Sequence, residues 1–131
     1  MLNNREYVNP DDVPKPIGPY SQAVKCTGNL LVFVSGQVAE NKDGELVGKG
    51  DPEKQARKAF ENLKSVLLES DMNIPDIVKL TVILAERAAY PAVSKVRREF
   101  FKEGFPAATS FVVAGLAKPE WLVEVEAIAV K

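Results

Sequence analysis

The sequence predicts an α+β domain, in which a mixed β-sheet carries two helices on one of its faces. Strand-like and helix-like segments follow one another in the order ββ-α-β-α-ββ, which is unlike the strict alternation of a doubly wound fold. The chain of 131 residues, 46% hydrophobic and 27% charged, shows no internal repeat and no linker. We therefore assign residues 1–131 to a single domain with one core.

The first two strands are expected at residues 20–26 and 30–35, because both segments are short and apolar. Thr27-Gly28-Asn29 separates them, and glycine and asparagine tolerate the positive φ angles of tight turns. This pattern predicts an antiparallel hairpin. Polar residues with turn chemistry, 40–45, follow as a loop.

A helix is expected at residues 52–70, where apolar side chains recur at helical spacing. Asp51 is typical of an N-cap, and Pro52 is typical of the first helical position. The later elements are a strand at 76–84, a helix spanning 92–101 that ends before Gly104, and strands at 109–114 and 122–130.

Two of the expected strands have apolar side chains on both faces. In residues 30–34 and 78–84, both alternating sets of side chains are largely apolar. Two helices cover only one face of such a sheet. Packing the second face against another copy of the chain would cover the rest, so the pattern favours a homo-oligomer.

The composition argues against several classes of function. There are 17 basic and 18 acidic residues, so no net field attracts a nucleic acid or an anionic membrane. The chain has no histidine, which excludes Ser-His-Asp and Cys-His nucleophiles, and we expect no metal site. Cys26 is the single cysteine and favours a reducing compartment. Without a signal peptide or a long apolar run, we predict a cytoplasmic protein.

Three segments are candidates for a site. Tyr20 stands at a junction between a loop and a strand, where its hydroxyl can point into a cleft. Ser35-Gly36-Gln37 ends a strand with small and polar residues that a ligand can approach closely. Glu124 and Glu126 interrupt an apolar strand on the same face. For each segment, an ordinary structural role remains an alternative.

Two other features are better explained as structural. Cys26 ends an apolar strand without a cationic neighbour in the sequence, which indicates a packing role. A basic run on the second helix is expected to form a solvated face, partly paired with nearby glutamates. The run consists of Lys95, Arg97, Arg98 and Lys102, and the glutamates are Glu99 and Glu103.

These segments together resemble the Rid family, the reactive intermediate deaminases that are also called YjgF-type or L-PSP endoribonuclease-like proteins. The resemblance runs in family order from about residue 15 to the end of the chain. The matching segments are Ile17-Gly18-Pro19-Tyr20-Ser21-Gln22-Ala23, Val34-Ser35-Gly36-Gln37, the helix from Gln55 to Leu63, Asp76 to Val82, Phe105-Pro106-Ala107 and Val123 to Val130.

The resemblance implies a chorismate-mutase-like fold, with sheets packed together in a homotrimer and ligand clefts between subunits. Enzymes of this family hydrolyse reactive enamines and imines, such as 2-aminoacrylate, to a 2-keto acid and ammonia, and they need no cofactor. In this chain the implied catalytic residues are Glu124, which would orient or activate water, and Tyr20. The implied substrate-binding residues are Ser35, Gly36, Gln37, Ser94, Ala108, Thr109 and Ser110.

The chain departs from the family pattern at position 108. The deaminases have an arginine there that binds the substrate carboxylate, and this chain has Ala108 and no arginine after Arg98. Losing such a charge-assisted pair costs about 2 to 5 kcal/mol of binding. We therefore expect poor hydrolysis of 2-aminoacrylate, unless a cation from elsewhere, such as Arg87 or Lys118, replaces the arginine.

Two functions remain open at this point. The first is an enzyme that hydrolyses another imine, enamine or related small molecule. The second is a trimer that binds a metabolite, or docks on a partner, without turnover. Nucleolytic activity is disfavoured, because there is no histidine and no excess of positive charge.

Overall fold

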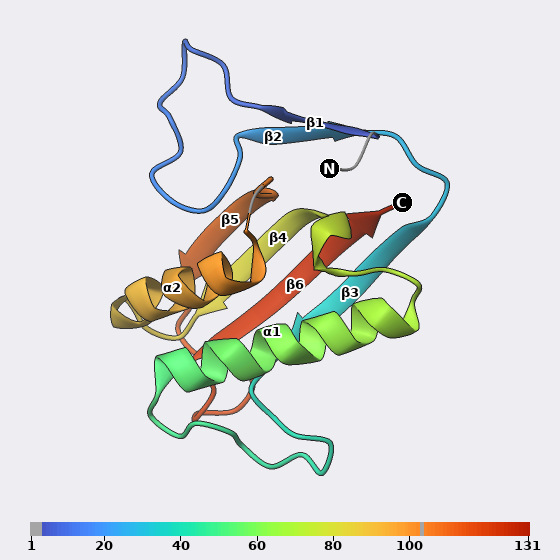
Figure 1. Cartoon of the computed structure of the whole chain (residues 1–131). Coiled ribbons are helices and arrows are strands. Elements are labelled where there is room, and N and C mark those ends of the chain that lie inside the picture. The colour runs from blue at the N-terminus through green and yellow to red at the C-terminus, as the bar shows by residue number, and fades with distance from the viewer. Residues whose placement is uncertain (1–3, 103) are drawn as a thin grey trace.

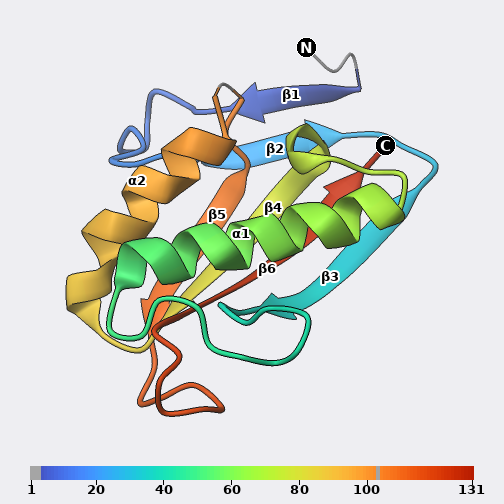
Figure 2. The ribbon, with the colours of Figure 1, turned by 60° about the horizontal axis from the view of Figure 1, so that its bottom comes forward.

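The computed structural model of the protein describes residues 4–102 and 104–131. Its four-stranded sheet has the order β3-β6-β4-β5, in which β6 is antiparallel to both neighbours and β4 is parallel to β5. Two helices lie side by side over one face of this sheet (Figures 1 and 2), which confirms the predicted α+β class. The elements are β3 (Leu31–Gln37), α1 (Pro52–Glu69), β4 (Ile77–Leu84), α2 (Tyr90–Phe100), β5 (Ala107–Val112) and β6 (Val123–Val130).

The first helix, α1, forms where the sequence predicts it. The carboxylate of Asp51 accepts a hydrogen bond from the backbone N–H of Lys54 at 3.0 Å, which caps the helix next to Pro52. Its apolar stripe is buried against β3 and β6. Phe60 is fully buried and stacks on Phe100 of α2, with ring centroids 5.3 Å apart. Aromatic packing therefore joins the two helices over the core.

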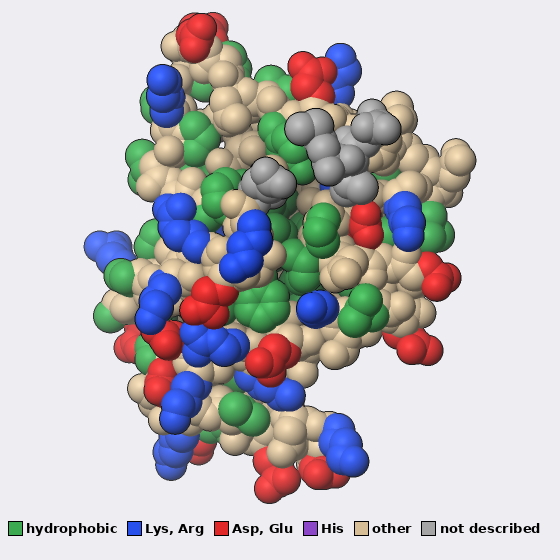
Figure 3. Space-filling model, viewed as in Figure 1, with side chains coloured by type: hydrophobic (Ala, Val, Ile, Leu, Met, Phe, Trp, Pro, Cys, Tyr) green, Lys and Arg blue, Asp and Glu red, His purple; other side chains and the backbone are tan. Residues whose placement is uncertain are grey.

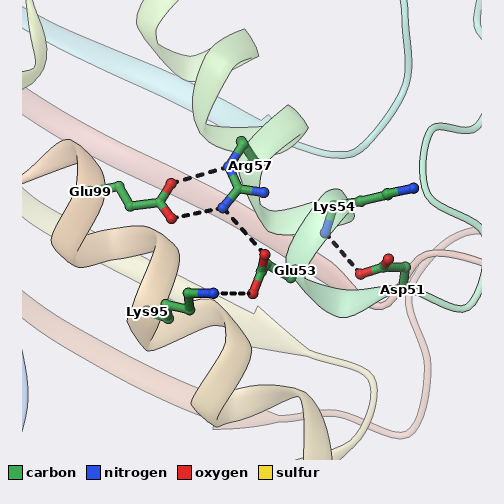
Figure 4. A network of polar contacts seen from close by, with 6 residues as sticks. All are labelled: Asp51, Glu53, Lys54, Arg57, Lys95 and Glu99. Atoms are coloured by element: carbon green, nitrogen blue, oxygen red, sulfur yellow. Dashed lines mark hydrogen bonds and ion pairs between the residues drawn. The ribbon is translucent and has the colours of Figure 1, made fainter.

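Charged side chains connect the outer surfaces of α1 and α2 (Figure 4). Arg57 binds Glu99 at 2.7 Å, and Lys95 binds Glu53 at 2.9 Å. The sequence predicts that the basic run pairs with the nearby Glu99 and Glu103. Glu99 instead binds α1, and Lys95 binds a glutamate of α1, while Glu103 lies outside the described residues. Blue and red side chains are interspersed over this face (Figure 3). Because such pairs are largely solvated, they add little to the stability of the fold.

The predicted hairpin between residues 20–26 and 30–35 is wrong. β2 (Ala23–Cys26) pairs instead with β1 (Arg5–Val8), a strand that the polar N-terminal sequence did not indicate. These two strands form a separate ribbon beside one end of the main sheet (Figure 1). β3 pairs with β6, almost a hundred residues later in the chain.

The glycine between β2 and β3 explains why a turn signal appears there without a hairpin. A Cβ at Gly28 would lie 2.5 Å from a methyl group of Val130 and 2.9 Å from the carbonyl oxygen of Lys131. The N–H groups of Asn29 and Leu30 both donate to that same oxygen at 3.0 Å. The glycine is therefore needed for close packing against the end of β6, and not for a tight turn.

The sheet face opposite the helices remains open in the single chain. On β3, the side chains of Leu31 and Phe33 point to this face and are 52% and 71% exposed. Phe111 on β5 faces the same side and is 45% exposed. The predicted apolar character of both sheet faces is thus present. Within the described part of the chain, no helix is both long and apolar enough to span a bilayer.

Candidate functional site

The side chain of Glu124 on β6 lies next to Gly36 on the neighbouring strand β3. The pairing between β3 and β6 shifts its register between Val34 and Gln37, so Gly36 falls within an irregularity. A Cβ on Gly36 would stand 2.7 Å from Cδ and 2.9 Å from Cγ of Glu124, and closer still to Oε1. The space that the glycine leaves free is therefore occupied by this carboxyl group.

The carboxylate of Glu124 is half-buried on the open face of the sheet. It stands opposite Ile83 of β4, and Glu126 follows on the same face opposite Thr81, as the alternation in the sequence predicts. Across residues 4–102 and 104–131, no side chain donates a hydrogen bond to Glu124. Its lone pairs are thus free to accept from water or a ligand.

The other two residues of the Ser35-Gly36-Gln37 segment flank this carboxylate. Ser35 is exposed, and its carbonyl oxygen accepts from the side-chain amide of Gln37 at 3.1 Å. The start of β6 is fixed by the buried side chain of Gln55 on α1. Gln55 accepts from the N–H of Leu122 at 2.8 Å and donates to the carbonyl of Glu120 at 3.0 Å. A rigid helix therefore positions Glu124.

Tyr20 belongs to a loop that is fixed to the start of β5. Ser21 donates from its N–H to the carbonyl of Pro106 at 3.0 Å and from its hydroxyl to that of Phe105 at 2.6 Å. It also forms a bridge with Ala107. These bonds hold the backbone next to the half-buried Tyr20 beside the Phe105-Pro106-Ala107 segment, although the two segments are more than eighty residues apart.

The three residues at the start of β5 alternate between the faces of the sheet. Ala108 and Ser110 pair with the buried Leu80 and Val82, so their side chains face the helices. Thr109 faces the open side and accepts a hydrogen bond from the ammonium group of Lys79 at 2.9 Å. The methyl group of Ala108 packs against the hydrophobic core.

On α2, Tyr90, Ser94 and Arg97 form a polar row at helical spacing, i, i+4 and i+7. Arg97 is only 1% exposed, which contradicts the prediction that the whole basic run is solvated. Its Nη2 donates to the carbonyl of Pro19 at 3.0 Å. Burial lowers the pKa of Arg97, while the nearby hydroxyls of Tyr90 and Tyr20 partly offset this effect.

The predicted site residues therefore form two groups within one subunit. Glu124 and Ser35-Gly36-Gln37 lie where β3 meets β6, whereas Tyr20, Ser94, Ala108 and Ser110 lie beside α2. Thr109 belongs to neither group, because it faces the open side from β5 next to Lys79. β4 separates β6 from β5, so the two groups are about 10 Å apart across the sheet and on opposite faces. A single chain does not bring them into one cleft.

Arg97 is the residue that the sequence analysis missed. The pattern contained a signal, because Val93, Val96, Arg97 and Phe100 share one face of a helix that must be buried. Of the two other cations, Lys118 and Arg87, one is paired and the other is exposed. Lys118 donates to Glu40 at 2.8 Å, which holds the pKa of that carboxyl below its usual value, and Arg87 is exposed.

Within the described residues, no group of three or more His, Cys, Asp or Glu side chains is arranged to hold a metal ion. A pocket of about 170 Å³ lies on the open face of the sheet, between β3, β6 and β4. Glu126, Lys79 and Thr81 line it together with Phe33 and Ile128. We assign this pocket to the exposed sheet face described above.

Comparison with known proteins gives consistent matches along the chain. Residues 11–131 match the family model described as endoribonuclease L-PSP. A RutC family protein of Pyrococcus horikoshii is 41% identical over 97% of this chain and 98% of its own length. The human 2-iminobutanoate/2-iminopropanoate deaminase is 33% identical over 97% of this chain and 90% of its own length. A crystal structure of a Rid-family protein of Yersinia pestis, whose function is described as unknown, superposes with a TM-score of 0.89 at 34% identity over 98% of this chain and 99% of its own.

Proposed function

The chain belongs to the endoribonuclease L-PSP family, which includes the Rid and RutC proteins, and on this premise we propose that it hydrolyses a small imine or enamine and releases ammonia. The relatives named as deaminases of 2-imino acids support this reaction class. The observation that carries the proposal is the half-buried carboxylate of Glu124, which lies over Gly36 with no donor among the described side chains.

In the proposed reaction, Glu124 takes a proton from a water molecule while the water oxygen attacks the imine carbon. The carbon–nitrogen double bond becomes a single bond, and the protonated Glu124 then returns a proton to the nitrogen. Glu124 next takes the proton of the new hydroxyl group and passes it to the nitrogen; the carbon–nitrogen bond breaks, its electron pair leaves with ammonia, and an oxygen lone pair forms the carbon–oxygen double bond. For 2-iminopropanoate the products are pyruvate and ammonia, and no cofactor takes part in this sequence.

A Glu124→Gln variant tests this role, because an amide of the same shape cannot take up the proton. We expect the release of ammonia from an imine generated in situ to fall about 10²- to 10⁴-fold, without loss of the folded state. Glu126→Gln, two residues along the same strand and outside the Gly36 contact, is the matched control. Full turnover by Glu124→Gln would remove the assignment.

We also propose that the protein acts as a homotrimer whose clefts lie between subunits. Two observations support this: Leu31 and Phe33 are exposed on the open sheet face, and the two groups of site residues are separated within one chain. A neighbouring subunit would cover the face and bring a second copy of one group to the other. The cytoplasm remains the predicted compartment.

Phe33→Lys tests the trimer, since a charge in the middle of a packed sheet face is strongly unfavourable. We expect light scattering to show about one third of the wild-type mass and ammonia release to be lost with it. Lys79→Arg, which keeps the charge on the same face, should leave the mass unchanged. A Phe33→Lys protein with wild-type mass would contradict an interface at this face.

A binding protein without turnover is the second candidate, and Ala108 is the observation that favours it. Without a cation at position 108, a carboxylate ligand loses about 2 to 5 kcal/mol at that position. This candidate predicts that an imine without a carboxylate raises the melting temperature but is not consumed faster than in buffer. Catalysed ammonia release would reject it.

A further inference from the structure

The guanidinium group of Arg97 is buried without a matching negative charge. Arg97 is 1% exposed, and its one hydrogen bond to a described backbone group goes from Nη2 to the carbonyl of Pro19. Nε is buried and has no partner. Among the residues that the structure describes, no carboxylate lies within ion-pair distance of Arg97. A buried charge in this condition is costly, so an anion that reached it would be bound strongly.

The surroundings of Arg97 favour an anion over any other ligand. Ser94, one turn earlier on α2, has a buried hydroxyl oxygen that also lacks a partner. The hydroxyl of Tyr90 lies on the same row, and Tyr20 approaches from the loop. A guanidinium and hydroxyl groups can all donate hydrogen bonds, and the two oxygens of a carboxylate are acceptors that match them.

The position of Arg97 is close to the segment where a family deaminase carries its arginine. Its guanidinium binds Pro19, and the next residues, Tyr20 and Ser21, are fixed to the backbone of residues 105–107. Ala108 follows directly, and its side chain points to the face that the two helices cover. Figures 1 and 2 show α2 lying alongside β5.

We propose that Arg97 binds the carboxylate of a 2-imino acid or 2-oxo acid, in place of an arginine at position 108. This inference rests on the proposed function, because it names the substrate class of the same site. The ligand enters between α2 and the loop of residues 17–20. The carbonyl of Pro19 in that loop accepts from the guanidinium, while Ile17 is 91% exposed and Tyr20 is half-buried, so the outer part of the loop is in contact with solvent.

Binding of pyruvate, measured by titration calorimetry on the full chain, tests the proposal without requiring turnover. We expect Arg97→Met, an apolar side chain of similar length, to weaken pyruvate binding at least about thirty-fold. Arg98→Met is the matched control, because Arg98 is the exposed neighbour on the same helix, and it should bind as the wild type does. Pyruvamide, which lacks the carboxylate, should bind weakly to all three proteins.

The double variant Arg97→Met/Ala108→Arg makes the test specific for the position of the cation. It restores a guanidinium from β5, and we expect it to recover most of the pyruvate affinity that Arg97→Met loses. A purely structural role of Arg97 would not be rescued in this way. If Arg97→Met does not fold, Arg97→Lys keeps the charge but not the planar fork, and its affinity should be intermediate.

Three results would overturn the proposal: unchanged affinity of Arg97→Met, no rescue by the double variant, or no pyruvate binding by the wild-type protein. These outcomes are distinct from failure of the proposed hydrolysis. Pyruvate binding that depends on Arg97, without any ammonia release, would keep this inference and reject the enzyme. Ammonia release with a KM for 2-iminopropanoate that is the same in the wild type and Arg97→Met would keep the enzyme and reject the role of Arg97.

Discussion

Gly36→Ala is expected to separate activity from stability in this protein. A Cβ at position 36 would stand 2.7 Å from Cδ of Glu124, whereas ordinary contacts begin at about 3.4 Å. The carboxyl carbon therefore has to retreat by at least about 0.7 Å, and Oε1 by more. A displacement of about 1 Å of a catalytic group costs about 10²-fold in rate, so under the role proposed for Glu124 kcat/KM for ammonia release should fall about a hundredfold.

Stability should respond much less than activity, since the group that must move is the end of a side chain on an open sheet face. Gly36 does not have a positive φ, so alanine fits its backbone. A compatible Gly→Ala change alters the free energy of unfolding by less than about 1 kcal/mol, and it often increases it. Chemical denaturation measures this quantity beside the rate.

Gly115→Ala provides the control, because a Cβ at Gly115 meets no atom within 4 Å. Both its rate and its stability should match the wild type. A Gly36→Ala protein with wild-type kcat/KM would contradict this prediction, since the carboxylate would then not need its observed position. A loss of rate that is matched by a loss of folded protein would refute it equally.

Two further predictions concern the helices. Asp51→Ala removes the N-cap of α1 and should lower the free energy of unfolding by about 1 kcal/mol in urea denaturation, whereas Asp51→Asn should retain most of it; equal stability of Asp51→Ala and wild type would show that the cap is dispensable. Hydrogen bonds from Lys95 and Arg57 lower the pKa of Glu53 and Glu99, so their stabilisation is complete above the ordinary value of 4.5 and is lost as the pH falls through the lowered values. The melting temperature of the wild type should accordingly exceed that of Arg57→Gln near neutral pH and converge with it in acid, and a gap that does not change with pH would contradict this account.

Local sequence signals were sufficient for the helices and most of the strands. Asp51 and Pro52 are adjacent in the sequence and together predict the start of α1. The alternation of side chains along β6 places Glu124 and Glu126 on one face of the sheet. The β1–β2 pairing joins Arg5 to Cys26 and depends on contacts between distant segments. Gly28 resembles a turn residue in the sequence, but a glycine is needed there because the end of β6 packs against it.

The candidate site was predictable only in part, for a related reason. Motif residues identified Glu124, Gly36 and Tyr20, but they did not show that these residues divide between two regions of one subunit. Arg97 belongs to a basic run in the sequence, and it was expected to be exposed because arginine side chains are rarely buried. Its burial follows from the helical face that it shares with Val93 and Val96, and the loop around Pro19 completes its cover.

The place of β6 in the sheet has a consequence for biosynthesis. β6 lies between β3 and β4, so the sheet cannot close until residues 123–130 have been made. At the usual speed of translation, β3 waits roughly 5 to 20 seconds for this partner. During that interval the apolar segment around Phe33 lacks its neighbouring strand, which leaves the edge of β3 open to aggregation.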